Sequence, residues 1–304
     1  MAETTPKAAA KPAPESKAKS GSSKKPDLAT LGGIALALFG IVGGLVLEKG
    51  SIQDIAQGTA AMIVFGGTFG AVLVTNPLGV VLRAFAGLKS ILIEETVSPD
   101  ATIDLLLGYA TKARKNGIVS LETEAAAISD PFLRKALGMA VDGTDLQEIK
   151  KMMDIDVTLS EQSAEAEAKV WESAGGYAPT IGIIGAVLGL IQVMKHLEDI
   201  KEVGHGIAVA FVATVYGVAS ANILFLPAAN KLRARMRQVT LLRDMTMEGI
   251  IGIVEGLNPT LIRMKLQSFN QNPKKPEDAK GKAKGKAAPG GKAEKAAPAA
   301  AAKA

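Results

Sequence analysis

The chain has 304 residues and no cysteine, and 48% of its residues are apolar while only 4% are aromatic. The absence of cysteine excludes disulfides and thiolate metal sites. The low aromatic content argues against an ordinary globular enzyme, whose core uses aromatic as well as aliphatic side chains. Alanine and glycine, of which the chain has 32, also recur within long apolar runs. This pattern is typical of membrane helices, because small residues let helix backbones approach each other.

The net charge of +5 comes from the two ends of the chain. Residues 1–27 carry six lysines against three acidic residues, a balance of +3, and residues 272–304 carry nine lysines against three, a balance of +6, which leaves −4 for the body. Both ends are rich in Lys, Ala and Pro and are predicted to be disordered tails, because they cannot bury enough apolar surface to offset their ordering entropy. The positive charge therefore does not indicate nucleic acid as a partner.

Four apolar stretches lie between the tails. They cover residues 28–47, 57–75, 178–194 and 206–229, and the second runs on toward Leu82. Each is close to the ~20 residues that a membrane-spanning helix needs. The first is too long for the apolar core of a signal peptide, and no small-residue cleavage site follows it. We therefore predict an all-α membrane protein with four transmembrane helices.

The positions of Lys and Arg predict the orientation, because cytoplasmic loops carry an excess of both. Basic residues precede the first span and follow the second and the fourth. The loop between the first two spans has Lys49 as its one basic residue. Both termini and the long middle segment are therefore expected in the cytoplasm, and the spans form two hairpins. The predicted parts are a tail (1–27), a transmembrane hairpin (28–82), a cytoplasmic helical domain (83–176), a second transmembrane hairpin (177–229), cytoplasmic helices (230–271) and a tail (272–304).

The middle segment is too polar for the membrane and contains helix boundary signals. Gly117 has the residue type of a helix C-terminus. Ser120, Asp130 with Pro131, and Thr144 with Gln147 have the residue types and spacing of helix N-termini. The last of these precedes a long predicted helix. We expect an all-helical cytoplasmic part that continues the membrane helices rather than forming a separate domain.

The cores of the four spans contain no Asp, Glu, Lys, Arg or His. A charge at the bilayer centre costs about 2.5–3.5 kcal/mol, and proteins usually keep one there only for function. Either this protein moves no ion, or a partner supplies the titrating group. Small residues recur about every four positions along each span, which favours close packing within the chain and, for the surplus, an oligomer around a slender partner helix.

Three residues near the last two spans are candidates for a role in coupling or ion passage. Pro179 and Pro227 each lack a backbone N–H, so each can start a helix, kink one, or serve as half of a hinge pair between membrane and cytoplasm. Thr214 carries the only hydroxyl in the middle of the small-residue face of the fourth span. Its hydroxyl can donate a hydrogen bond to its own helix or contact an ion that passes along the span.

Five segments have counterparts in a known family of membrane proteins. "LGGIALALFGIVGGLVLEKGS" resembles a first span, "APTIGIIGAVLGLIQVM" a third, and "GIAVAFVATVYGVASANILFLPAANKL" a fourth. "KARKNGIVSLE" is similar to a cytoplasmic torque segment and "EGLNPTLIRMKL" to a C-terminal helix. In this order they resemble the MotA/PomA flagellar motor stator subunits, within the MotA/TolQ/ExbB proton channel superfamily. The resemblance covers about residues 28–268.

The resemblance implies an assembly in the bacterial inner membrane. It implies a homo-oligomer, a pentamer in the family, around two helices of a MotB- or PomB-type partner that has one span and a membrane Asp. That partner would supply the carboxylate that this chain lacks. Ion flow, worth ~2.3 kcal/mol per charge per 100 mV, would then turn the ring against a FliG-type rotor protein.

The resemblance also assigns roles to individual residues. Arg114 and Glu122 match the rotor-facing charged pair of the family, and Lys115 falls in the same cluster in some members. Without the resemblance, these three would be interpreted as a solvated charged face. Pro179 and Pro227 match the two prolines of the family.

The expected ion follows from two positions. Sodium-type relatives place extra hydroxyls where this chain has Ala186 in the third span and Ala213 in the fourth, while Thr214 matches a threonine of the family. Methyl groups offer no oxygen to a bare cation. We therefore expect H+ rather than Na+ as the transported ion, and no cofactor.

Other classes remain open. The chain resembles, less closely, the ExbB/TolQ energisers of non-flagellar machines, which typically have three spans, and a passive membrane scaffold is a second alternative. An enzyme is not expected, because the sequence shows no paired catalytic carboxylates, no HExxH motif, no serine nucleophile with a histidine and no phosphate-binding glycine loop. His196 and His205 flank an outer loop and are expected to be exposed rather than to act as ligands.

Overall fold

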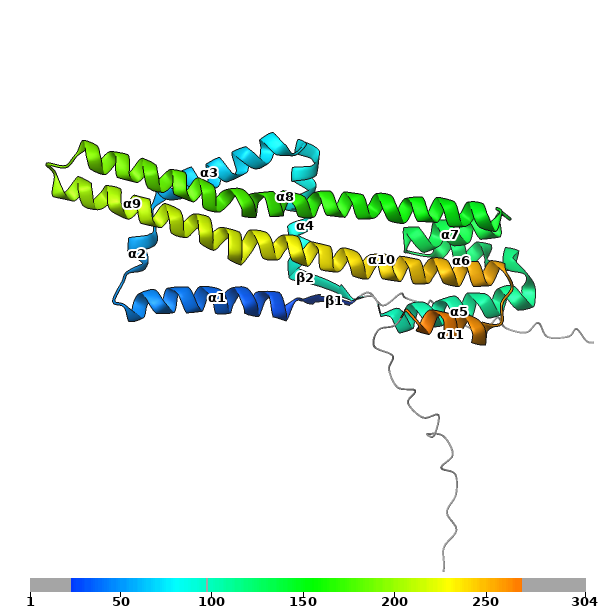
Figure 1. Cartoon of the computed structure of the whole chain (residues 1–304). Helices are drawn as coiled ribbons and strands as arrows, with labels where there is room; N and C mark the ends of the chain where they lie inside the picture. Colours follow the sequence, from blue (N-terminus) through cyan, green and yellow to red (C-terminus); the bar gives the residue numbers. More distant parts are fainter. Residues whose placement is uncertain (1–22, 97, 270–304) are drawn as a thin grey trace, which may run out of the picture. The chain divides into compact units, whose positions relative to one another are not determined.

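The computed structural model describes residues 23–96 and 98–269 (Figure 1). The helices are α1 (Leu28–Leu47), α2 (Ile52–Ile55), α3 (Gly58–Thr75), α4 (Leu78–Leu92), α5 (Pro99–Asn116), α6 (Glu122–Ala127), α7 (Pro131–Val141), α8 (Leu146–Lys195), α9 (Ile200–Ala219), α10 (Leu226–Val254) and α11 (Pro259–Gln267). A 3₁₀ turn, Ile118–Leu121, precedes α6, and a π-helical turn, Ser220–Phe225, joins α9 to α10. The predicted helical membrane fold is confirmed.

A short antiparallel ribbon was not predicted. Strand β1 (Ser23–Pro26) pairs with β2 (Ile93–Thr96), and Pro26 lies opposite Ile93. Residue Asp27 then caps α1 by accepting a hydrogen bond from the Thr30 amide. The predicted tail boundary at residue 27 is therefore wrong for residues 23–27, because pairing and capping order this stretch. The remainder of that tail and the tail 272–304 lie outside the described residues.

Four helical segments are long and apolar enough to cross a membrane, as predicted. Two of these helices continue far beyond the thickness of a membrane. Helix α8 has 50 residues and the joined α9–α10 helix has 55, so each is about 75–80 Å long at 1.5 Å per residue, against a hydrocarbon core of about 30 Å. They run side by side in opposite directions (Figure 1). The predicted boundaries at residues 177 and 230 are thus not breaks in the backbone.

Local signals set some helix ends and miss others. Gly117 ends α5 with a φ of 83°, and Asp130 caps α7 by accepting from the Phe132 amide, both as predicted. Ser120 does not begin a helix, because its hydroxyl bonds back to Gly117 and α6 starts two residues later. The cap of α8 is Asp145, whose carboxylate accepts from the Gln147 amide, rather than Thr144.

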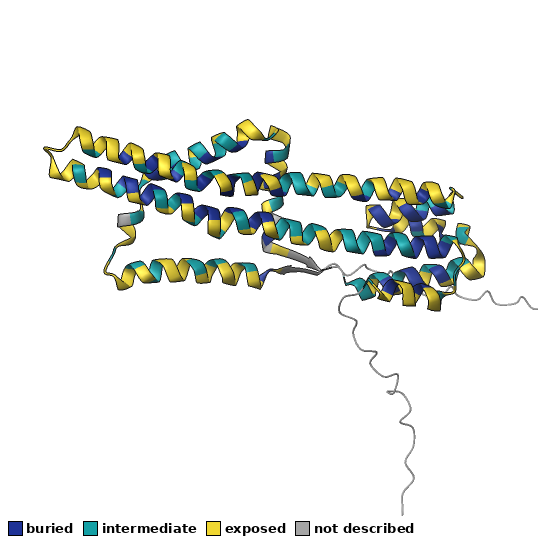
Figure 2. Cartoon of the chain, viewed as in Figure 1, coloured by how far each residue is buried: buried dark blue, intermediate teal, exposed yellow. Residues whose placement is uncertain are grey.

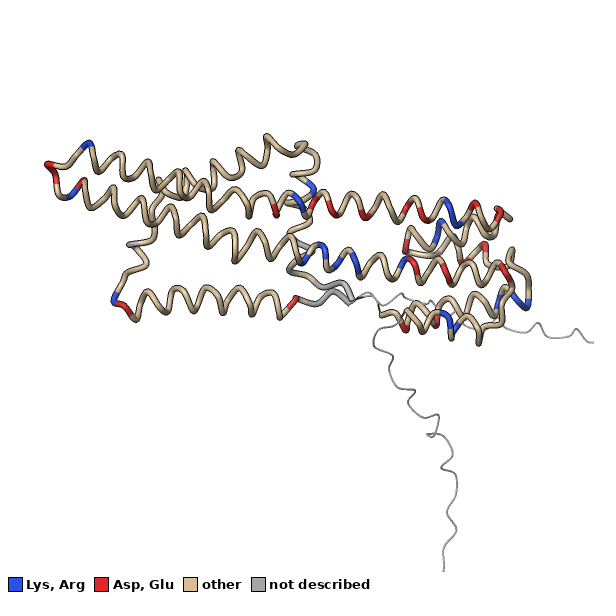
Figure 3. Tube along the Cα trace, viewed as in Figure 1, with Lys and Arg blue, Asp and Glu red and all other residues tan. Residues whose placement is uncertain are grey.

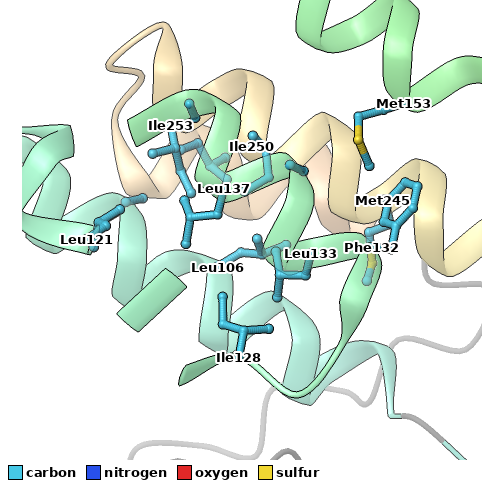
Figure 4. Close-up of a cluster of buried hydrophobic side chains, with 14 of the residues drawn as sticks. Leu106, Leu121, Ile128, Phe132, Leu133, Leu137, Met153, Met245, Ile250 and Ile253 are labelled. Carbon is cyan, nitrogen blue, oxygen red and sulfur yellow. The ribbon is translucent and has the colours of Figure 1, made fainter. Parts of the chain in front are cut away.

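The cytoplasmic core gathers α5, α6, α7 and α11 around the membrane-distal parts of α8 and α10 (Figure 4). Its most deeply buried large side chains are Leu106, Leu121, Leu137, Ile149, Met153, Met245, Ile250, Ile262 and Leu266. Because both long helices contribute to this core, it is built on the same two elements that cross the membrane. The core is therefore continuous with the membrane spans along the backbone of these two helices.

Four aromatic side chains meet at one junction. Trp171 of α8 packs edge-on against Phe85 of α4, with ring centroids 5.0 Å apart, and lies 6.0 Å from Phe225 of the π-turn. Phe69 of α3 contacts both phenylalanines at 5.6 and 5.8 Å. The Trp171 indole also donates to the Ala84 carbonyl. This aromatic cluster joins the first hairpin to the second, where α8 passes from apolar to polar sequence.

Charge and exposure follow the predicted membrane position. Figure 3 shows Lys, Arg, Asp and Glu along the cytoplasmic parts and at the outer loops, with none along the middle of the four spans. Figure 2 shows α1 without a buried residue along its length. Its apolar side chains are thus left for lipid or for other chains.

We expect Trp171→Ala to lower the free energy of unfolding by about 3–5 kcal/mol, because the change leaves a cavity in the aromatic cluster. Trp171→Phe should cost less, since it keeps a ring. Thermal unfolding of the purified protein in detergent, followed by circular dichroism, measures this. Phe39→Ala is the control, because that side chain on α1 is 76% exposed. Equal unfolding midpoints for Trp171→Ala and Phe39→Ala would contradict the structural role.

Candidate functional site

The small-residue faces of α8 and α9 pack against each other within the chain. A Cβ atom added at Gly182 would lie 2.9 Å from the Ala213 carbonyl oxygen, and one at Gly217 would lie 2.5 Å from the Ala178 carbonyl oxygen. Gly189 approaches the Ala210 amide in the same way. Only glycine allows backbones this close. The close packing predicted from these faces is therefore made inside one subunit.

The glycines of the first hairpin behave differently. Gly40 and Gly44 on α1, and Gly66 and Gly70 on α3, have room for a side chain, with no other part of the described chain within 4 Å. Gly67 is the exception on α3, where Ile181 fills the space. The glycines of α1 and most of those of α3 are thus not used to pack this chain against itself.

The residues predicted for ion passage lie on these two helices. The Thr214 hydroxyl donates to the Ala210 carbonyl of its own helix at 3.2 Å, and the side chain is half-buried. Ala213 is fully buried and packs toward Gly185, whereas Ala186 is half-buried on α8. The own-helix bond predicted as one alternative for Thr214 is therefore present. The role of these residues in ion passage stays a prediction.

The two prolines border one stretch of the α8–α9–α10 hairpin. Pro179 lies inside α8, next to the residue that packs on Gly217, and Pro227 is the second residue of α10. Just before it, the Leu226 amide donates to the Ala221 carbonyl, five residues back. Proline cannot donate a backbone hydrogen bond, and a π-turn just before it lets the helix continue past Pro227. The sequence did not indicate this turn, since it has no residue signature.

Two polar side chains that local sequence patterns do not reveal join separate helices, one of them across the two hairpins. The Tyr216 hydroxyl of α9 donates to the Ile55 carbonyl and accepts from the Gln57 amide, which fastens the α2–α3 linker to the fourth span. Arg233 of α10 donates to Glu165 at 2.8 Å and to Glu172 at 2.5 Å on α8. This pairing lowers the pKa of both glutamates. It locks α8 to α10 just outside the membrane.

The predicted rotor-facing residues meet at one end of the cytoplasmic core. Arg114 and Lys115 occupy the last turn of α5, and Glu122 is the first residue of α6. All three side chains are exposed, and they form no ion pair within the described residues. Lys112 and Glu124 on the same two helices pair with each other instead, which lowers the pKa of Glu124. The charges of Arg114, Lys115 and Glu122 are thus free to contact another protein.

An apolar hollow lies beside Arg114, one of these three charged residues. It has a volume of about 350 Å³, and Arg114 forms part of its wall together with residues of α5, α7 and the α10–α11 turn. Ala113, Ile118, Ile253 and Leu257 are among its apolar lining residues. A charged rim next to an apolar depression is suited to contact with a protein surface. The described residues contain no group of His, Cys, Asp and Glu that could hold a metal, and His196 and His205 are exposed as predicted.

Two family profiles match the chain. The profile "Motility protein A N-terminal" matches residues 31–117, and the profile "MotA/TolQ/ExbB proton channel family" matches residues 124–245. Together they cover the four spans from residue 31 on and the part of the cytoplasmic core that α5 to α8 and the first two thirds of α10 contribute. The first of them spans the early hairpin and the α5 segment that ends at Gly117.

Named relatives and solved structures agree with these profiles. Motility protein A of Bacillus subtilis (strain 168) is 34% identical over 250 residues, which is 80% of this chain and 90% of the relative. A structure titled "Structure of C. jejuni MotAB" matches with a TM-score of 0.76 and 32% identity, over 83% of this chain and 98% of that one. The flagellar MotAB stator complex from Bacillus subtilis matches with a TM-score of 0.74 and 34% identity, over 80% and 96%.

We expect Gly217→Ala to lower the free energy of unfolding by about 1–3 kcal/mol, because the new methyl group collides with the Ala178 backbone and forces α8 and α9 apart. Gly70→Ala is the matched control, since that methyl group would enter open space and alanine favours a helix over glycine. Chemical unfolding of the isolated subunit in detergent compares the two. A Gly217→Ala variant as stable as Gly70→Ala would show that the α8–α9 contact is looser than described.

Proposed function

As a member of the MotA/TolQ/ExbB proton channel family, this chain is a MotA-like stator subunit of the flagellar motor, and we propose how its parts carry out that work. It is a multi-pass membrane protein, and a MotB-type chain is its partner, as in the matched MotAB complexes. We place it in the bacterial inner membrane, as a pentamer that contacts a FliG-type rotor protein. Its task is to couple ion flow to torque rather than to catalyse a reaction.

The continuity of the two long helices is the observation that carries this proposal. Helix α8 and the α9–α10 helix each contain a membrane span and also build the cytoplasmic core that presents Arg114 and Glu122. A rotation or tilt of the spans therefore displaces the charged end directly. Arg233 braces the two helices against each other along the way.

The partner supplies the acidic group. The spans of this chain contain no carboxylate, and a membrane Asp on a MotB-type helix would provide the titrating site. Each elementary charge that crosses 100 mV releases ~2.3 kcal/mol, which is enough to bias a conformational step by more than tenfold. We propose H+ as the ion, because Ala186 and Ala213 offer no oxygen ligands for Na+.

Contact with the rotor is assigned to Arg114, Lys115 and Glu122. Their charges are exposed and not neutralised within the described chain. Charge complementarity of this kind sets register and association rate more than affinity. The neighbouring apolar hollow would add contact area to the charged rim.

We expect Glu122→Lys or Arg114→Glu to reduce swimming strongly while leaving membrane abundance and co-purification with the MotB-type partner unchanged, since neither side chain packs in the core. Glu198→Lys in the outer loop is the control, because it makes the same charge change far along the chain from α5 and α6. Swimming speed, membrane abundance and partner co-purification are measured for each. A variant that no longer accumulates in the membrane would show that these residues are structural instead.

The ion is tested separately from the rotor contact. We expect swimming to continue when sodium is replaced by potassium at constant pH, and to stop when a protonophore collapses the proton gradient. The experiment uses the unmodified stator with its own partner. Loss of rotation on sodium withdrawal alone would overturn the proton assignment and leave the assignment as a stator intact.

A further inference from the structure

Asp27 is a buried carboxylate just outside the first span. It precedes α1 and is only 4% exposed. One carboxylate oxygen accepts from the Thr30 amide at 3.0 Å, and the other lies 2.5 Å from the Lys231 ammonium and 3.4 Å from the Arg235 guanidinium. These contacts, the Lys231 hydrogen bond first, hold the pKa of Asp27 well below its ordinary value. A buried carboxylate is tolerated only when it is paired in this way.

Arg235 extends this cluster to a third part of the chain. Its guanidinium donates to the Ile93 carbonyl at 2.7 Å and to the Ile91 carbonyl at 3.1 Å, where α4 passes into β2. Ile93 in turn pairs with Pro26, next to Asp27. The start of α1, the end of α4 and the first turns of α10 therefore converge on one charged centre.

Beyond its first turn, helix α1 packs only sparsely against the rest of the described chain, chiefly on α4 and the π-turn. It contains no buried residue, and its glycines have no other part of the described chain within 4 Å. The small van der Waals gain that usually fixes a membrane helix against its neighbours is thus largely missing within this subunit. Within the described residues, the side-chain contacts of Asp27 and the neighbouring β1–β2 backbone pairing are consequently the polar attachments of the cytoplasmic end of α1 to the rest of the chain.

The residues of α10 that contact Asp27 lie on the cytoplasmic side of the π-turn. Lys231 and Arg235 follow Pro227 by four and eight residues, so they lie on one face of α10 beyond the interruption. Arg233, between them, points instead to Glu165 and Glu172 on α8. A bend at the π-turn would change the angle between α9 and α10 while leaving the Asp27 contacts in place.

We propose that Asp27, Lys231 and Arg235 form a positioning clamp that makes the first span move with α10 and the cytoplasmic core rather than with α9. The clamp connects α1 to the part of the helix that lies on the cytoplasmic side of the π-turn. The proposal concerns the motion of this subunit. It rests on the proposed stator function only where swimming is the readout.

The absence of cysteine makes this motion measurable in the full chain. Spin labels on Ala29→Cys and Ala234→Cys, both at exposed positions, report the distance across the clamp. A second pair, Ala29→Cys and Val218→Cys, reports the distance from α1 to the far side of the π-turn. The labelled subunit is diluted with unlabelled subunit and purified with its partner in lipid nanodiscs, so that each distance belongs to one chain.

We expect a narrow Ala29–Ala234 distance distribution in the native chain and a broader Ala29–Val218 distribution. Asp27→Asn keeps an N-capping oxygen but removes the charge, so it separates capping from ion pairing. Loss of one partner of a buried ion pair should lower the ratio of clamped to released α1 by about a hundredfold, which is observed as a broad Ala29–Ala234 distribution. Asp27→Glu, which keeps the charge, should retain more of the narrow distribution.

Lys231→Met provides a second route to the same answer if Asp27→Asn does not accumulate in the membrane. Asp104→Asn is the matched control, because Asp104 pairs with Arg263 at 3.0 Å on the exposed surface and should leave both distributions unchanged. An unchanged Ala29–Ala234 distribution in Asp27→Asn or Lys231→Met would overturn the clamp. Swimming should fall in the same variants with partner co-purification preserved. The distance result requires no rotor, so it stands or fails independently of the stator assignment.

Discussion

Direct backbone contact between α8 and α9 is the constraint on which the rest of the structure depends. In a membrane, apolar side chains gain little by leaving lipid for protein, so helices associate through close packing and hydrogen bonds. Gly182, Gly189 and Gly217 allow this approach, since any side chain there would collide with the opposite backbone. Once α8 and α9 are joined in this way, their small faces are no longer available to a partner. A partner helix would therefore contact other faces of the spans.

The basic residues after the fourth span serve two purposes. Their excess in the cytoplasm orients the protein. Their spacing then divides them between two neighbours, because residues two apart on a helix point in nearly opposite directions. Arg233 faces Glu165 on α8, whereas Lys231 and Arg235 face Asp27. The same run of charge thus connects α10 to the third span on one side and to the first span on the other.

The sequence predicted what depends on composition and local spacing, and little of what depends on distant contacts. Long uncharged runs identify spans, and Gly117 identifies a turn, because both signals are local. The continuity of α8 through Pro179 is a tertiary effect, since packing on α9 offsets the missing hydrogen bond. Asp27 was assigned to a tail because its partners lie more than 200 residues away along the chain. At the candidate rotor site the resemblance located Arg114 and Glu122, but only the structure distinguishes them from the neighbouring pair that is neutralised internally.

The π-turn lets the α9–α10 helix stay continuous although its backbone hydrogen bonding is irregular at one point. Its backbone bonds run five residues back, which widens the helix locally and makes room before Pro227. The chain does not break there, so α10 stays in line with the fourth span and displacement passes along it. Phe225 within the turn packs against Trp171 of α8, which supports the widened segment on the side of its neighbour. This packing opposes a bend of the turn toward the aromatic cluster. In the proposed motor, a continuous helix of this kind would carry a displacement of the fourth span to the cytoplasmic end of α10.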